Sequence, residues 1–221
     1  MTLKELIKSR YSVRSFTDEM VGIEKIKEIL DIANSAPSGG NIQPWKVYVV
    51  TGNSKNKLTS KALHNFDNGV QEEIAYEIYP KPLEDEYKRR RSQCAADMYK
   101  ALSIEKDDIE SRLKQVRENF RFFGAPVGMI ITIDKSFAKN GWGHVGMYLQ
   151  NLCLVAIDNG LGACLQESWS IYPQTVKEVI GHDDNEVIWC GVALGYPNKD
   201  DPINQYRTSR ENIDKFVSFL D

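Results

Sequence analysis

The chain has 221 residues, 42% of them hydrophobic, and a formal net charge of -3 at pH 7. This length and composition support one sizeable hydrophobic core, so we expect a single domain over residues 1–221. The mildly acidic balance gives no general attraction for nucleic acid or an anionic membrane, so neither is an expected partner.

The first residues show no basic stretch followed by an apolar region, and no apolar run approaches the roughly 18 residues of a membrane-spanning helix. We therefore expect a cytoplasmic protein. The four cysteines form no C-x-x-C pair and have no histidines at zinc-like spacing, which indicates reduced structural thiols and no metal site.

The N-terminal third shows two helical patterns. Thr2 and Glu5 match a capping box, which predicts a first helix running to about Arg10. Apolar residues at helical spacing predict a second helix over 23–33. It should stop before Pro37, because a residue that precedes proline disfavours the helical conformation.

The next elements are a loop and three strands. The loop at 38–41 leads into an expected strand at 45–50, and short β-branched runs predict further strands at 127–133 and 187–194. An almost uncharged helix at 145–157 separates the last two. Strands separated by helices favour an α/β or α+β sheet with helices packed against it.

The segment from about 66 to 118 differs from the rest of the chain. It is charged, and Pro80 and Pro82 interrupt it, while apolar residues over 109–116 predict a helix. We interpret this segment as an excursion from the core. A last helical face is expected over 213–220.

The first group of candidate functional residues follows the first helix. Arg10, Ser12 and Arg14 alternate with other residues, and guanidinium groups bind phosphate through forked, charge-assisted hydrogen bonds to which a hydroxyl adds another. The alternative is that both arginines cap the end of the helix and lie in water.

The second group is the loop A-P-S-G-G-N-I-Q-P-W at 36–45. Its glycines permit close approach of a flat ligand, and the amides of Asn41 and Gln43 suit the edge of a heterocycle with carbonyls and ring nitrogens. The alternative is a plain connection between a helix and a strand.

The two groups together, R-x-S-x-R at 10–14 followed by A-P-S-x-x-N-x-Q-P-W at 36–45, resemble the opening of the FMN-dependent nitroreductase family. The resemblance continues in N-F-R-F-F-G-A-P at 119–126, G-L-G-A at 160–163 and G-V-A-L-G-Y at 191–196. It therefore covers nearly the whole chain. Within the family the chain is most similar to the nitrobenzoate and nitroaromatic reductase branch. The shared features are the Tyr-Pro region at 79–80 and the Arg-Arg pair at 90–91.

The resemblance implies an α+β fold with a central, mostly antiparallel sheet flanked by helices. It also implies an interlocked homodimer with FMN bound across the interface. The 10–14 segment of one chain and the 36–45 loop of the other chain then reach the same flavin. The candidate FMN-binding residues are Arg10, Tyr11, Ser12, Arg14, Ser38, Gly39, Asn41, Gln43, Asn119, Gln166, Glu167, Ser168, Arg207 and Arg210.

Some of these roles have alternatives. The stretch that contains Gln166, Glu167 and Ser168 matches the family segment whose backbone passes flavin N5. The alternative for Glu167 is a simple strand-end carboxylate. In the family a basic residue near the C-terminus meets the phosphate, and Arg207 and Arg210 both fit that description.

The implied activity is reduction of a nitroaromatic or quinone-like acceptor by NADH or NADPH in a ping-pong cycle. FMN carries the hydride, no side chain acts as a catalyst, and Arg14 supports the reduced cofactor electrostatically. His144 has no partners at triad-like spacing and is interpreted as structural. Trp142, Phe122 and Phe123 are candidate aromatic walls of the acceptor site.

The 66–118 excursion falls where the family places a lid over the flavin. Within it Glu72 and Tyr76 stand four residues apart, as in a deiodinase lid pair, although a contact on a solvated helix is the commoner explanation. Two alternative functions stay open: a flavin-dependent dehalogenase, and a flavin-binding protein without turnover.

Overall fold

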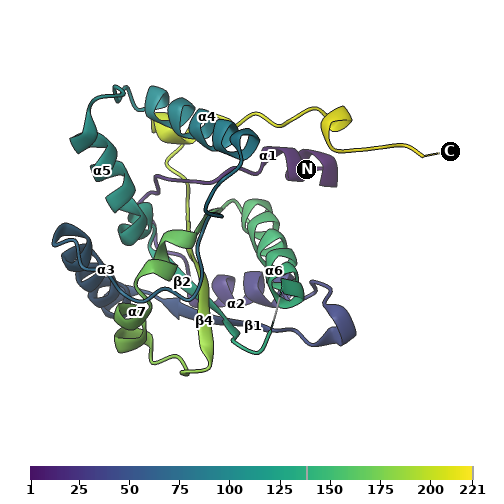
Figure 1. Ribbon diagram of the computed structural model, residues 1–221. Helices are drawn as coiled ribbons and strands as arrows, with labels where there is room; N and C mark the ends of the chain where they lie inside the picture. The colour runs from purple at the N-terminus through teal and green to yellow at the C-terminus, as the bar shows by residue number, and fades with distance from the viewer. Residues whose placement is uncertain (138, 221) are drawn as a thin grey trace.

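The computed structural model describes residues 1–137 and 139–220. Its centre is a four-stranded sheet of order β1-β2-β4-β3, in which every pair of neighbours is antiparallel (Figure 1). This confirms the predicted antiparallel sheet. The strands are β1 (Trp45–Val50), β2 (Val127–Asp134), β3 (Gly162–Gln166) and β4 (Glu186–Gly195).

The sheet is covered by helices on both faces. One face packs on α2 (Ile23–Ala33) and α6 (Lys139–Asp158), and the other on α3 (Gly52–Asp67) and α7 (Pro173–Ile180). β2 supplies both cores because its side chains alternate: Met129, Ile131 and Ile133 face the first helix pair, and Ile130 faces the second.

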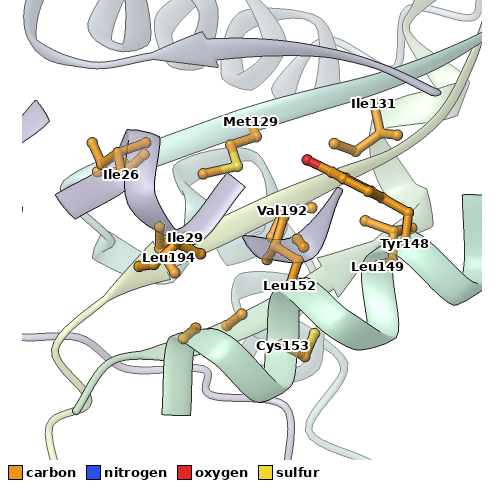
Figure 2. Packing of buried hydrophobic residues seen from close by; sticks show 14 of the residues in the cluster. Ile26, Ile29, Met129, Ile131, Tyr148, Leu149, Leu152, Cys153, Val192 and Leu194 are labelled. Atoms are coloured by element: carbon orange, nitrogen blue, oxygen red, sulfur yellow. The ribbon is translucent and has the colours of Figure 1, made fainter. Parts of the chain in front are cut away.

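Figure 2 shows the first of these cores. Ile26 and Ile29 of α2 lie near Met129 of β2 and Leu152 of α6, and all four are almost fully buried. Their spacing of three residues along α2 puts Ile26 and Ile29 on one helix face, which is the face that the sequence pattern predicted.

The remaining helices are more peripheral. α1 (Leu3–Ser9) begins with the predicted capping box, in which Thr2 N donates to Glu5 Oε2 at 2.8 Å and Glu5 N donates to Thr2 Oγ1 at 3.3 Å. α4 (Asp85–Ala101) and α5 (Ile109–Arg117) bury none of their residues. The 3-10 turns are η1 (Gly39–Asn41), η2 (Glu118–Gly124), η3 (Glu167–Ile171), η4 (Pro202–Asn204) and η5 (Ile213–Lys215).

The predicted C-terminal helix is wrong. Only the turn η5 forms there, and the chain beyond it is extended, with Phe216 72% and Leu220 93% exposed. A short amphipathic segment is not stable as a helix without a surface to pack against, and the described apolar side chains of this segment are exposed.

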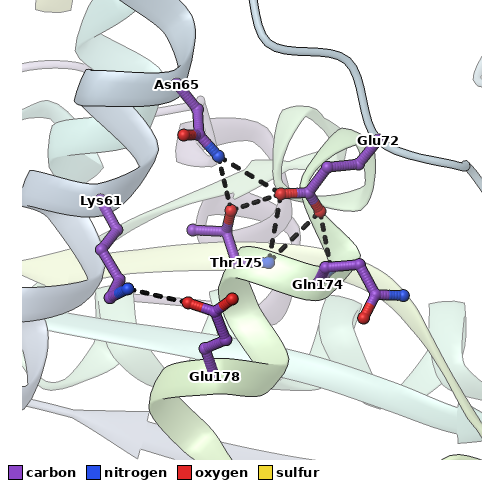
Figure 3. A network of polar contacts seen from close by, with 6 residues as sticks. All are labelled: Lys61, Asn65, Glu72, Gln174, Thr175 and Glu178. Carbon is purple, nitrogen blue, oxygen red and sulfur yellow. Dashed lines mark hydrogen bonds and ion pairs between the residues drawn. The ribbon is translucent and has the colours of Figure 1, made fainter.

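The solvated-helix interpretation of Glu72 and Tyr76 is also wrong, because residues 68–84 form no helix. Figure 3 shows the Glu72 carboxylate at the start of α7, where it accepts hydrogen bonds from Gln174 N at 2.6 Å and Thr175 N at 3.2 Å. The carboxylate thereby caps the positive end of α7 and ties the excursion to the core. Tyr76 donates instead to the carbonyl of Trp189 in β4.

All four cysteines are free, and three of them are buried. Burial raises the pKa of the Cys153 thiol to about 12, which keeps it protonated and unreactive. Cys94 differs because it is exposed on α4. Among the described residues no helix is long and apolar enough to cross a membrane.

Candidate functional site

The segment after α1 lies in extended form along β3. Val13 N donates to the carbonyl of Ala163 at 3.1 Å, and the backbone passes so close to Gly162 that a Cβ there would lie 2.4 Å from Val13 Cγ2. Glycine at 162 is therefore required for this contact. Val13 is buried, while Ser12 and Arg14 on either side of it are partly exposed.

Three of the predicted phosphate-binding residues influence the titration of Cys164 in β3. Burial raises the pKa of the Cys164 thiol, and Arg14, the Ser12 hydroxyl and Arg10 each oppose that rise. Residues 10, 12 and 14 alternate along the extended segment whose Val13 is bonded to β3. The alternation in the sequence thus yields a cluster of two cations and a hydroxyl at one strand.

Asn204, which the sequence analysis did not single out, fixes this segment to the C-terminal part of the chain. Its Oδ1 accepts from Arg14 N at 2.9 Å, and its Nδ2 donates to the carbonyls of Ser15 at 2.7 Å and Asn198 at 2.8 Å. Arg14 also donates to the Tyr206 hydroxyl at 3.1 Å. Asn204 stands in a polar stretch without periodicity, so no sequence signal marked it.

The structure separates the two arginines that compete for the phosphate. The Arg207 guanidinium stacks over the Tyr11 ring at 3.8 Å and donates to the carbonyl of Asn204 at 2.7 Å. Arg210 instead bonds to Thr208 Oγ1 at 2.7 Å and lines a pocket against α4. Only Arg207 of the pair therefore touches a residue of the 10–14 cluster.

A second group lies at the far end of β3. Gln166 Nε2 donates to the carbonyl of Asn119 at 2.7 Å, which fixes the orientation of its amide. The Gln166 side chain is buried, and its Oε1 has no hydrogen-bond partner among residues 1–137 and 139–220. A buried acceptor without a donor costs free energy, so a hydrogen bond from a ligand to this oxygen would be favourable.

Glu167 and Ser168 follow directly in η3. Desolvation raises the pKa of the Glu167 carboxyl above its ordinary range. Burial raises the pKa of Tyr76 to about 12. Its hydroxyl donates to the carbonyl of Trp189, two residues before Gly191, which pairs with Gln166 at the end of β3. The 68–84 part of the excursion therefore borders this end of β3.

The loop with Ser38, Gly39, Asn41 and Gln43 lies elsewhere. Within the described residues no hydrogen bond or ion pair joins it to the 10–14 cluster, and Figure 1 shows it beyond α2 and α6. Gly39 N donates to His144 Nε2 at 3.1 Å, so His144 belongs to this loop's surroundings. One chain thus presents three groups of candidate residues, and this loop is separate from the 10–14 cluster.

Two expectations about side chains change. Phe122 and Phe123 are buried core residues, with the Phe122 ring stacked on Trp169 at 4.5 Å, so they do not line an open acceptor site. Trp142 is partly exposed and packs edge-on against Tyr76 at 4.6 Å. α6 begins at Lys139, earlier than the predicted helix over 145–157, so His144 lies inside it.

The protein has an α+β fold built on a small antiparallel sheet, and its topology is nitroreductase-like. The arginine cluster lies on a segment beside β3. The profile of the Nitroreductase family matches residues 7–196. The chain belongs to the nitroreductase family.

Among curated proteins, the nitrobenzene nitroreductase of Ectopseudomonas oleovorans is 34% identical over 99% of this chain and 96% of its own length. The 4-nitrobenzoate reductase of Pseudomonas putida is 34% identical over 97% of this chain and 94% of its own. These two support the predicted resemblance to the nitrobenzoate and nitroaromatic reductase branch.

Among solved structures, the FMN and NADPH-dependent nitroreductase NfnB of Sphigopyxis sp. strain HMH superposes with a TM-score of 0.96 at 32% identity, covering 100% of both chains. NfnB of Mycobacterium smegmatis, solved in complex with NADPH, gives a TM-score of 0.93 at 26% identity, covering 99% of this chain and 97% of that one.

The residues present fit FMN on chemical grounds. A phosphate monoester carries nearly two negative charges at neutral pH, which calls for more than one cation, and Arg10, Arg14 and Arg207 lie in one region. The orphaned Gln166 Oε1 supplies a buried acceptor at the other end of the same strand.

Proposed function

We propose that the protein is an FMN-dependent oxidoreductase that uses NADH or NADPH to reduce nitroaromatic or quinone-like acceptors by a ping-pong mechanism. The observation that carries the proposal is the arginine segment held along β3 between the Asn204 anchor and the orphaned Gln166 amide. It occurs in a chain with a curated relative named as a nitrobenzene nitroreductase and a structural relative named as an FMN and NADPH-dependent nitroreductase.

FMN, when bound, supplies the two-electron chemistry, and the protein supplies position and electrostatics. Arg10 and Arg207 are our candidates for the phosphate, with Arg210 held away against α4. Arg14, fixed by Asn204 and Tyr206, is the cation that favours negative charge on the pyrimidine side of the cofactor. The β3 end at Gln166, Glu167 and Ser168 contributes backbone and amide groups near the hydride-accepting edge.

The site is completed, in this proposal, by a second copy of the chain. Among the described residues no hydrogen bond or ion pair joins the Ser38–Gln43 loop to the arginine cluster of its own chain, so in this proposal the loop serves the flavin of the partner. The apolar side chains left exposed at both termini give the partner a surface to cover. They are Leu3, Ile7, Phe216, Phe219 and Leu220.

The 66–118 excursion serves as a lid over the acceptor site within the single domain. α4 and α5 bury no residues of their own, and α4 is fastened to the C-terminal segment by Arg90, whose Nε donates to Glu211 at 3.0 Å. At the opposite end of the excursion, Tyr76 reaches η3 and β4. Elements with few buried contacts are those that open at low cost.

The dehalogenase reading receives no support from Glu72 and Tyr76. Glu72 is engaged by the N-terminus of α7, and Tyr76 by the Trp189 carbonyl, so neither is available as a lid pair.

Steady-state kinetics tests the function. With NADPH or NADH and a nitrobenzoate acceptor, double-reciprocal plots at several acceptor concentrations are expected to be parallel, because the first product leaves before the acceptor binds. Intersecting lines would overturn the ping-pong mechanism. Absence of acceptor-dependent nucleotide oxidation with nitrobenzoate, nitrobenzene and a benzoquinone would overturn the activity.

A further inference from the structure

One face of α6 frames the Ser38–Gln43 loop. His144, Tyr148 and Asn151 are spaced four and three residues apart, which places them on the same side of the helix. Asn151 Nδ2 donates to the carbonyl of Ala33 at 3.4 Å, and the Tyr148 ring stacks on Trp45 at 4.9 Å between centroids. These two contacts fix the start and the end of the loop.

His144 makes the contact at the loop's middle. Gly39 N can only donate, so His144 Nε2, 3.1 Å away, must carry a lone pair and act as the acceptor. The ring lies close: a Cβ at position 39 would be 3.4 Å from His144 Cε1. The other ring nitrogen, Nδ1, is buried and has no partner in the part of the chain that the structure describes, where the bond to Gly39 N is the one that orients the ring.

The loop that His144 holds is strained. Gly40, Asn41 and Gln43 have φ values of 60°, 55° and 46°, a conformation that side-chain-bearing residues rarely adopt. Inside the loop Ser38 Oγ accepts from Gln43 N at 3.0 Å, and Gln43 Nε2 donates to the carbonyl of Asn41 at 3.1 Å. All three residues with positive φ are exposed, so packing does not impose their conformation.

A strained and exposed loop persists only where other contacts determine it. Here those contacts are the internal hydrogen bonds of the loop and the acceptor on α6. Without that acceptor, Gly39 N would lose its partner, and the loop would be free to relax toward ordinary backbone angles.

We propose that His144 is a positioning residue: by accepting the Gly39 amide it holds the Ser38–Gln43 loop in the strained conformation that meets the flavin. The inference rests on the proposed function, since it takes FMN as the ligand of this loop. His144 touches neither cofactor nor acceptor, and its effect passes through the backbone of the loop.

The test compares His144→Phe, which keeps a ring and removes the acceptor, with His144→Gln, whose amide oxygen can replace Nε2. His64→Gln is the matched control, because His64 is an exposed histidine on α3. Each full-length variant is titrated with FMN, and hydrogen–deuterium exchange is followed over residues 37–44. His144→Ala, which adds no bulk, replaces His144→Phe should the latter not purify as folded protein.

We expect His144→Phe to exchange faster over 37–44 and to bind FMN about threefold to tenfold more weakly, the loss of one hydrogen bond. His144→Gln should stay within about twofold of wild type, and His64→Gln should not differ. Equal exchange and affinity in wild type and His144→Phe would overturn the inference, as would an equal loss in His144→Gln and His144→Phe. Wild-type protein that binds no FMN would instead show that the proposed function has failed.

Discussion

Asn204 holds the arginine segment in place through hydrogen bonds to its backbone. It is 3% exposed, and both ends of its amide are used, by Arg14 on one side and by Ser15 and Asn198 on the other. An amide in this position converts a flexible polar stretch into an anchor for the 10–16 segment.

Replacing Asn204 with alanine is expected to lower the free energy of unfolding by about 3 kcal/mol, because buried backbone groups lose their partners. Urea denaturation of the apoprotein measures this. Gln205→Ala is the control, since Gln205 is exposed. A loss of the same size in both variants would show that the buried amide has no special role.

Arg10→Ala tests the phosphate assignment. The variant is expected to bind FMN roughly tenfold to a hundredfold more weakly, the worth of one hydrogen bond to a charged group. Lys8→Ala removes a charge two residues earlier, in the last turn of α1, and should leave affinity nearly unchanged. Fluorescence titration with FMN measures both, and full retention of FMN by Arg10→Ala contradicts the assignment.

Among the elements, β1, β2 and β4 share an ionic network around the buried Glu186 carboxylate, with Lys46 itself exposed, and the sequence did not reveal it. The Glu186 carboxylate on β4 accepts from Lys46 Nζ at 2.7 Å, Tyr48 Oη at 3.0 Å and Thr132 Oγ1 at 2.5 Å. Burial pushes the pKa of Glu186 upward, but these hydrogen bonds outweigh it and leave the pKa below its ordinary value of 4.5.

The lowered pKa of Glu186 predicts how the stability of the fold depends on pH. A carboxyl whose folded pKa is depressed stabilises the fold above its unfolded pKa, and that contribution is lost as the pH falls through the folded pKa. Wild-type stability should therefore decline below about pH 4.5, the unfolded range. Glu186→Gln should be less stable at pH 7 and show a flatter decline in acid-dependent thermal melts. An identical slope in both proteins would contradict the role of Glu186.

The elements differ in how far the sequence could predict them. β2 and most of β4 are β-branched runs and were predicted within one residue at each end, and α2 follows its apolar spacing. β3 was missed because Gly-Ala-Cys-Leu-Gln contains no β-branched residue, and α3 because its sequence is mostly polar. Both elements are stabilised by contacts with distant parts of the chain, which periodicity does not encode.

The candidate site shows the same division. The motifs predicted Arg10, Ser12 and Arg14 as binding residues, which stays a prediction, and the structure holds their segment in extended form beside β3. Asn204 contacts Arg14, which lies 190 residues away in sequence, and His144 contacts Gly39, which lies 105 residues away. Such pairings depend on the tertiary fold and have no local pattern.

At the scale of the whole molecule, the exposed apolar termini bear on assembly. Phe216, Phe219 and Leu220 are expected to be covered by a second copy of the chain. Replacing all three with serine should shift the protein from dimer toward monomer in sedimentation equilibrium, and FMN affinity should fall with it. A wild-type protein that sediments as a 25.2 kDa monomer with FMN bound would contradict the shared site.

The central claim is that this chain binds FMN and exchanges electrons with a nicotinamide through it. The visible absorption spectrum of the purified protein, supplied with FMN and recorded anaerobically before and after addition of NADH or NADPH, tests it most directly. We predict yellow flavin bands that bleach with the nucleotide and return on addition of a nitroaromatic. A colourless protein that takes up no FMN, or bound flavin that neither nucleotide bleaches, would contradict the account.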